Sequence, residues 1–307
     1  MRKSHLKPLA AVTGALALAA TLSACGGSSA ASDEKVVTVY SADGLKGENG
    51  DGWYDKVFKD FEKKTGIKVE YVEGGSGEMV QRAAREKSNT QADVLVTLPP
   101  FIQQADSKGL LTAYEPAGSD QVDGADKSSD SKWTSVVNNY FGFVYNGKEP
   151  AMEYLKKLQA NNVGPSASTG KLAPKVDKGE LLVANGDVQM NYAQSKDMPN
   201  LGIWFPAKSG SKPTTFALPY AAGLVSKAPH SANGKKLLDF MLSEQAQKDV
   251  SEVGGGFSAR KDIEATDANA IELSKLMGGV EVFEPDWSDI GADLDGYVDA
   301  WKTATGS

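Results

Sequence analysis

Strand and helix patterns alternate with short connections from residue 36 to residue 100, and this alternation constrains the fold more than any other feature. The strand patterns are rich in β-branched residues or alternate apolar with polar side chains. The helix patterns repeat apolar residues every three or four positions. We expect strands at 36–40, 67–72 and 93–98, with helices from Trp53 to Gly66, from Gly77 to about Lys87, and after Pro100. Such a chain is typical of an α/β fold with a parallel sheet and right-handed crossovers.

Two extended segments, at 136–145 and 214–225, matter most for the topology. A chain of 307 residues is long enough for two domains. With two domains, we expect the first lobe to contain residues 36–138 and 222–307 and the second lobe to contain residues 139–221. The two extended segments would then be the hinge crossings between these lobes. Two ordinary sheet strands would give the same pattern, and periodicity leaves that alternative open.

The other patterns complete the predicted elements. They indicate a polar loop at 117–131, strands at 188–192 and 201–205, and helices at 152–160, up to Leu182, at 234–241, 244–250, 268–277 and 294–301.

Residues 1–24 have the pattern of an export signal. A basic start precedes a short apolar stretch that is too short to anchor the chain as a membrane helix. The stretch ends in Leu22-Ser23-Ala24-Cys25, which resembles the lipobox of bacterial lipoproteins, whose cysteine is acylated. The Gly/Ser/Ala-rich residues that follow, within 25–35, suit a flexible tether. We therefore expect an extracytoplasmic domain that is lipid-anchored to the cell membrane through Cys25; a plain secretory signal is the alternative.

Composition excludes several classes of function. The net charge is −7, and because the first 24 residues contain three basic and no acidic residues, the remainder carries −10. Nucleic acid is an unlikely partner for such an acidic body. One cysteine and two histidines exclude a disulfide framework and most Cys/His metal sites. No cofactor is expected.

The ends of the first three strands carry hydroxyl groups, which makes them the first candidate ligand site. Ligands of open α/β sheets bind beyond the carboxyl ends of the strands. Ser41, Ser76 and Thr97 each lie where a strand stops. Ser76 also precedes a helix, so its hydroxyl and the N–H groups of the Gly77 region can hold an anion. A simple turn at Gly74–Gly77 is the alternative.

A second hydroxyl-rich loop, Ser166–Gly170, also precedes a predicted helix. Ser168 and Thr169 would supply neutral donors from the opposite lobe, although they would equally serve as a helix cap. Helix ends and hydroxyls suit a phosphate, phosphonate or carboxylate in an acidic protein. Aromatic candidates for the cleft include Tyr192 and Tyr220, and Asp43 would meet a ligand ammonium; core packing and surface exposure are their alternatives.

Catalytic motifs are absent from the sequence. It contains no HExxH, GxSxG, P-loop or GxGxxG pattern, and the only histidine after the signal is His230. We expect no enzymatic activity.

Several motifs resemble the extracellular solute-binding proteins of ABC importers, of the two-lobed kind related to ferric-iron binders. They are Val39–Ala42, Ser76–Glu78, Ala92–Thr97, Gly186–Met190, Lys235–Gln247 and Gly254–Asp262. The resemblance implies a type II periplasmic-binding-protein-like fold with two lobes, each a mainly parallel sheet flanked by helices. Residues 74–79 and 96–101 are most similar to proteins provisionally named as 2-aminoethylphosphonate binders.

Two departures from the family pattern limit what the resemblance implies. Iron binders of this family usually carry adjacent tyrosines in the second lobe, and here Tyr192 has no tyrosine neighbour, which disfavours ferric iron. After Asn146 the family normally continues for about forty residues that this chain lacks, so the second lobe is expected to be shortened.

These observations predict a monomeric receptor that closes two lobes on a small anionic or zwitterionic ligand and delivers it to an ABC permease. For an organophosphonate, the phosphonate would contact Ser41, Ser76, Gly77, Thr97, Ser168 and Thr169, and the amine would contact Asp43, Tyr192 and Tyr220. Ferric iron, phosphate and polyamines are alternative ligands. A surface lipoprotein without a transport role, with an incomplete second lobe, is a different class that the short junction at 147–150 leaves open.

Overall fold

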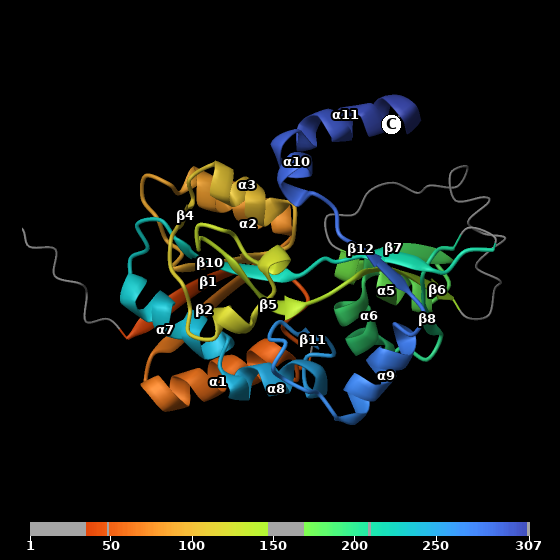
Figure 1. Cartoon of the computed structure of the whole chain (residues 1–307), viewed down its shortest axis with the longest axis horizontal. Coiled ribbons are helices and arrows are strands. Elements are labelled where there is room, and N and C mark those ends of the chain that lie inside the picture. Colours follow the sequence, from red (N-terminus) through yellow and green to blue (C-terminus); the bar gives the residue numbers. More distant parts are fainter. Residues whose placement is uncertain (1–34, 48, 147–168, 208–209, 306–307) are drawn as a thin grey trace, which may run out of the picture. The chain divides into compact units, whose positions relative to one another are not determined.

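The structure, a computed structural model, describes residues 35–47, 49–146, 169–207 and 210–305 (Figure 1). The predicted signal, Cys25, Ser168 and the helix expected at 152–160 lie outside the described residues.

The larger sheet has the strand order β11–β5–β10–β3–β1–β2, with β4 paired to β10. Its strands are β1 (Val36–Ala42), β2 (Lys68–Gly74), β3 (Val94–Thr97), β4 (Leu111–Thr112), β5 (Thr134–Asn138), β10 (Tyr220–Val225) and β11 (Phe257–Ser258). β1 pairs in parallel with β2 and β3, as the alternating pattern predicted. β10 runs antiparallel to β3 and β5, so the sheet is parallel on one side and antiparallel on the other.

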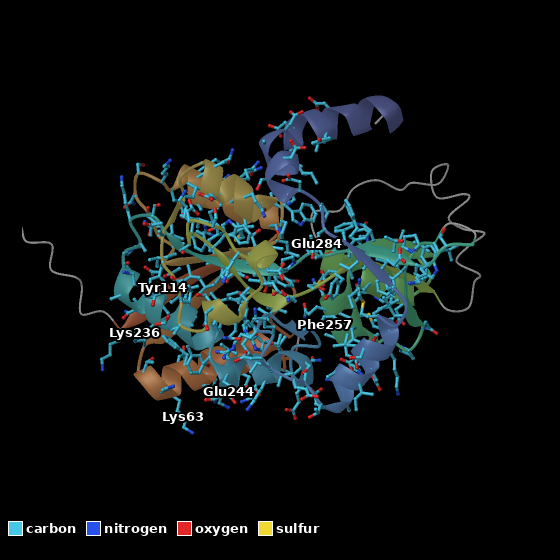
Figure 2. The ribbon with its side chains drawn as sticks, viewed as in Figure 1. Lys63, Tyr114, Lys236, Glu244, Phe257 and Glu284 are labelled. Carbon is cyan, nitrogen blue, oxygen red and sulfur yellow. The ribbon has the colours of Figure 1, made fainter. Side chains whose placement is uncertain are left out.

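Helices cover both faces of this sheet (Figure 1). On one face lie α1 (Trp53–Thr65), α7 (Ser231–Met241) and α8 (Glu244–Glu252); on the other lie α2 (Ser76–Arg85) and α3 (Phe101–Ser107). Lys63 of α1 and Glu244 of α8 are exposed and point away from the sheet (Figure 2). Gly66 ends α1 as predicted, in the left-handed conformation.

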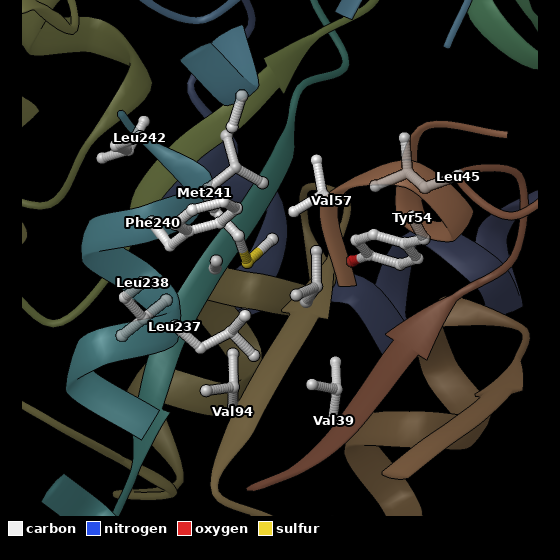
Figure 3. Packing of buried hydrophobic residues seen from close by; sticks show 14 of the residues in the cluster. Val39, Leu45, Tyr54, Val57, Val94, Leu237, Leu238, Phe240, Met241 and Leu242 are labelled. Carbon is white, nitrogen blue, oxygen red and sulfur yellow. The ribbon is translucent and has the colours of Figure 1, made fainter. Parts of the chain in front are cut away.

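Alternation along the strands fills both faces with apolar side chains. Val39 and Val94 belong to the cluster that contains Leu237 of α7 (Figure 3). The residues that follow them, Tyr40 and Leu95, belong to the cluster beneath α2 and α3. The strands that were recognised by their continuous apolar runs are therefore buried on both sides.

A smaller sheet has the order β7–β6–β8. Its strands are β6 (Phe141–Asn146), β7 (Val183–Asp187) and β8 (Leu201–Trp204), with η3 (Thr169–Lys171), α5 (Ala173–Asp177) and α6 (Val188–Ser195) around them. β6 is antiparallel to both neighbours, so the mainly parallel sheet predicted for the second lobe is wrong for these strands. β7 and β8, which α6 connects, run in the same direction. β6 lies between them and runs in the opposite direction.

The strand predicted at 188–192 is in fact the start of α6. The stretch Val-Gln-Met-Asn-Tyr alternates apolar with polar residues, which favoured a strand. Asp187 instead caps a helix by accepting a hydrogen bond from Met190 N at 2.8 Å. All five residues are buried, so the helix has no polar face from which its period could be recognised. The helix that was predicted to continue up to Leu182 is shorter than expected, since α5 ends at Asp177.

After β11 the chain contacts α6 beside the smaller sheet, and its strand β12 (Glu281–Phe283) forms a separate two-stranded sheet with β9 (Thr214–Phe216). The remaining elements are α9 (Ala268–Leu276), α10 (Trp287–Ala292) and α11 (Leu294–Thr305), with η1 (Ser119–Gln121) and η2 (Gly124–Asp126) in the polar loop. β12 pairs in parallel with β9, and Leu273 of α9 packs against Val188 and Tyr192 of α6. Residues 222–307 were expected in the first lobe, and within them α9 and β12 contact α6 and β9 instead.

Both extended segments are divided between sheets. Residues 136–145 contribute to β5 in the larger sheet and β6 in the smaller one, and residues 214–225 contain β9 and β10. The two connections touch each other, because Leu218 N donates to Asn139 O at 2.8 Å and Tyr140 bridges Ala217. That they act as hinges stays a prediction.

Candidate functional site

The carboxyl ends of β1, β2 and β3 meet at one edge of the larger sheet. Ser41 is paired with β2 and β3, and the Asp43 amide donates to the Gly74 carbonyl at 3.1 Å. Thr97 ends β3, and Tyr220 begins β10, which runs beside β3 in the opposite direction. The structure thus brings four predicted site residues to the edge at which open α/β sheets bind ligands.

Helix α2 begins at this edge without a side-chain cap. Its N-cap is Gly75, and among the described residues no side chain caps the first N–H groups. Ser76 is the first helical residue, although the sequence analysis placed it before the helix, and its Oγ accepts from Leu98 N at 3.4 Å. Free N–H groups and the helix dipole together favour an anion at such an end.

Thr97 adds an unsatisfied hydroxyl beside that helix end. Its side chain is 0% exposed, and Oγ1 has no hydrogen-bond partner among the described residues. A buried polar group without a partner destabilises a fold by about 1–3 kcal/mol. A ligand oxygen that accepts from this hydroxyl would remove that cost.

Two other predicted residues have structural roles at this edge. A Cβ on Gly77 would lie 2.9 Å from the Phe101 ring, so a glycine permits α2 and α3 to approach closely. The Ser41 hydroxyl is fully buried, donates to Ala42 O at 2.8 Å and lies 3.0 Å from the Tyr54 hydroxyl. Its hydroxyl proton is therefore donated to a buried backbone carbonyl and not to the cleft.

A cavity of about 710 Å³ opens next to the carboxyl edge and is called here the α6 pocket. It is lined by the loop between β1 and α1, by Gly170 and Lys171, by α6 and the residues just after it, by the segment 252–255, by Glu73 and by Asn269. Asp43 and Tyr192 are the predicted site residues in its wall. A second cavity of about 890 Å³, between α3, η2 and α10, contains none of the predicted residues.

Asp43 is held at the pocket by Tyr220. The Tyr220 hydroxyl donates to Asp43 O at 3.1 Å, and burial, followed by the charges of Asp187 and Asp43, raises its pKa well above the usual value. Gly44 follows with φ +108°, and a Cβ there would lie 2.5 Å from the same hydroxyl. Only glycine fits this turn, which brings β1 against α6.

Asp187 places a second carboxyl group near Asp43. Burial is the main cause that raises the pKa of Asp187 to about 6, and the charge of Asp43 adds to it. The hydrogen bond from Met190 N acts in the opposite direction. The site therefore has a surplus of negative charge on the α6 side.

The Tyr192 hydroxyl is directed at α9. It lies 3.0 Å from Asn269 Oδ1, hydrogen-bonds Glu272, and accepts from Lys196 Nζ at 2.6 Å. Burial and the hydrogen bond with Glu272 raise its pKa. Tyr192 thus joins α6 to α9, and its hydroxyl is already hydrogen-bonded to protein groups.

Thr169 begins η3, where its carbonyl accepts from Leu172 N at 2.9 Å. The next residue, Gly170, lies close to β1, since a Cβ built on it would be 3.5 Å from Asp43 Oδ2. The predicted hydroxyl loop is therefore near Asp43, with Ser168 outside the described residues.

Sequence reasoning missed Asp187, Gln189 and Gln194, which lie in or beside the α6 pocket. The available signal was the Gly-Asp pair before an apolar stretch, since aspartate is a preferred N-cap. The strand assignment of residues 188–192 concealed it.

Two general observations concern the described residues. None of their helices is both long and apolar enough to cross a bilayer. No group of three or more His, Cys, Asp and Glu side chains among them is arranged to hold a metal ion.

Comparisons with known proteins agree with this architecture. A relative in Salmonella paratyphi A, provisionally named a 2-aminoethylphosphonate-binding periplasmic protein, is 39% identical over 320 residues, covering 89% of this chain and 94% of its own. That match is longer than the 307 residues of this chain, so it includes gaps in the chain. The position of the gap after Asn146 stays a prediction.

Solved structures confirm the predicted fold class at low sequence identity. A periplasmic binding protein of Actinobacillus pleuropneumoniae, with fructose-6-phosphate bound, is 18% identical with a TM-score of 0.70 over 88% of this chain and 98% of its own. The ferric binding protein of Campylobacter jejuni is 19% identical with a TM-score of 0.66 over 87% and 98%. Residues 46–248 match the model of one family, and the chain belongs to that family, the bacterial extracellular solute-binding proteins.

Proposed function

We propose that the chain is the substrate-binding component of an ABC importer and that it captures a small organophosphonate such as 2-aminoethylphosphonate. The proposal is supported by the 39% identity to the Salmonella relative, whose name refers to that ligand. The observation that carries the site is the uncapped start of α2 beside the unpartnered hydroxyl of Thr97.

The phosphonate binds at the start of α2. The first N–H groups of the helix and the hydroxyls of Ser76 and Thr97 donate to its oxygens, and no Lys or Arg is required. The ammonium end extends towards Asp43, which adjoins Gly74 at the same edge. Thr169, whose neighbour Gly170 lies close to Asp43, approaches the ligand from the second lobe.

Binding and release, with no chemical reaction, are the function of the site. A ligand that contacts both lobes stabilises the closed state, and the permease recognises that state. No cofactor participates. The protein acts as a monomer outside the cytoplasm, exported by residues 1–24 and held at the membrane by lipid on Cys25, with 25–35 as its tether.

Calorimetric titration of the purified protein with 2-aminoethylphosphonate tests this proposal. Phosphate, ethanolamine, ferric citrate and putrescine are the comparison ligands. We expect saturable binding of 2-aminoethylphosphonate, which carries both an ammonium and a phosphonate group. Phosphate and ethanolamine should bind weakly, because phosphate has only the anionic end and ethanolamine has only the ammonium end. Tight binding of iron or putrescine would assign a different ligand, and a folded protein that binds none of the five would favour a lipoprotein without a transport role.

A further inference from the structure

Two glutamine side chains in the wall of the α6 pocket have amide oxygens that accept no hydrogen bond from the described residues. They are Gln189 and Gln194, both on α6. Gln189 is 1% exposed, so water does not satisfy its oxygen. Gln194 is half-buried, and its Oε1 is shielded from solvent as well.

The orientation of each amide is fixed by its nitrogen. Gln189 Nε2 donates to Gly254 O, and Gln194 Nε2 donates to Gly170 O at 3.1 Å. Rotating either amide would place an oxygen against a carbonyl, so both oxygens stay unpaired. Gln247 differs, because its Oε1 accepts from Ser258 Oγ and Ala259 N, each at 2.9 Å.

The charge of the pocket favours a donor as the missing partner. Five Asp and Glu residues and three Lys residues of the described chain line it. One of these lysines, Lys196, is already paired with Glu272 at 2.8 Å. Buried acceptors in a wall with surplus carboxylates suit a positively charged group that donates several hydrogen bonds.

We infer that the α6 pocket binds a primary ammonium group, which donates to Oε1 of Gln189, to Oε1 of Gln194 and to the carboxylate of Asp43. The inference rests on the proposed function in that the ammonium belongs to an aminophosphonate whose phosphonate lies at α2. The two glutamines then select aminophosphonates over phosphonates without an amine. A site built around polar partners discriminates strongly against a ligand that leaves them unpaired.

The test compares 2-aminoethylphosphonate with ethylphosphonate, which lacks only the amine. Both are titrated into the wild-type protein and into Gln194→Met, Gln189→Met and Gln245→Met. Gln245 is an exposed residue of α8 outside the pocket and provides the control. Gln194→Met lies on a half-buried helix position and is expected to fold even if Gln189→Met does not.

We expect Gln194→Met to weaken 2-aminoethylphosphonate binding about tenfold or more, as for other hydrogen bonds to a charged group, and to change ethylphosphonate binding less than twofold. An unchanged ratio of the two affinities in both pocket variants overturns the inference while the proposed function stands. A wild-type protein that binds neither phosphonate contradicts the proposed function. In that case, ethanolamine binding that Gln194→Met weakens still supports the ammonium site, and absence of ethanolamine binding overturns it.

Discussion

At the scale of single residues, Thr97 allows stability and ligand binding to be separated. Its hydroxyl is buried without a partner, so Thr97→Val should leave the free energy of unfolding unchanged or raise it by about 1–2 kcal/mol. If the hydroxyl donates to the phosphonate, the same variant should bind 2-aminoethylphosphonate about tenfold more weakly. Urea unfolding and calorimetric titration measure the two effects.

Thr134→Val is the matched control for this variant. Thr134 is also buried with an unpartnered hydroxyl, but it lies on β5, which β10 separates from β3. It should reproduce the effect on stability and leave affinity unaltered. Equal affinity of the two variants and the wild type would remove Thr97 from the site.

Residue positions along strands were predictable, but side-chain partners were not. The β-branched runs placed Ser41 and Thr97 at strand ends, where the structure has them. Whether a hydroxyl there is free depends on a neighbour from another element. Tyr54 of α1 lies against the Ser41 hydroxyl, and nothing of the described residues bonds that of Thr97. Such pairings arise from tertiary packing, which one strand's pattern does not encode.

At the scale of elements, the cap of α6 should make stability depend on pH. The folded-state pKa of Asp187 is raised to about 6, above the value of 3.8 for an exposed group. The protonated Asp187 carboxyl therefore contributes its full share to the free energy of unfolding below pH 3.8. This contribution is lost as the pH rises to about 6, and the free energy does not change further above that pH through this group. The loss amounts to about 3 kcal/mol.

Asp187→Asn removes this titration and keeps a side chain that caps helices well. Below pH 4 we expect the variant and the wild type to have equal free energies of unfolding. Above pH 6 the variant should be more stable, by about 3 kcal/mol at most. Urea unfolding at pH 3.5, 5 and 7.5 measures the difference. A constant difference over this range would mean that Asp187 is not the titrating group.

The contact between α6 and α9 gives a second element-scale prediction. Tyr192→Phe removes the hydroxyl that bonds Glu272 and Lys196, so the free energy of unfolding should fall by about 1 kcal/mol. Affinity for 2-aminoethylphosphonate should change less than twofold, because the ring that lines the pocket is kept. A tenfold loss of affinity would instead show that the Tyr192 hydroxyl contacts the ligand, as its place among the predicted amine contacts implies.

Helices with one buried face were predicted well, and α6 was not, for a reason that lies in its environment. α1 has both an apolar stripe and a glycine end signal, and its predicted bounds agree with the structure. α6 is buried all round at residues 188–192 and so lacks a stripe. The antiparallel order of the smaller sheet depends equally on pairings between distant segments, which local periodicity does not determine.

At the scale of the whole molecule, the sites proposed for the two ends of the ligand lie on elements of different sheets. The phosphonate site is on α2 and β3 of the larger sheet, and the ammonium site joins Asp43, which follows β1 of the larger sheet, to α6 beside the smaller one. The connections between the sheets pass side by side through Asn139 and Leu218. A ligand shifts a conformational equilibrium only when it binds one state better than the other. A ligand with an ammonium group therefore favours closure, whereas a ligand that occupies the α2 site alone does not.

Small-angle X-ray scattering with saturating ligands tests this difference. 2-Aminoethylphosphonate should decrease the radius of gyration, and ethylphosphonate, which occupies only the α2 site, should leave it nearly unchanged. Both ligands should still stabilise the protein, by about 2.7 kcal/mol at one hundred times the dissociation constant, so that stabilisation alone does not report closure. Gln194→Met should lose the decrease with 2-aminoethylphosphonate even at saturation. A radius that never changes with bound ligand would contradict closure and leave the two sheets as one rigid body.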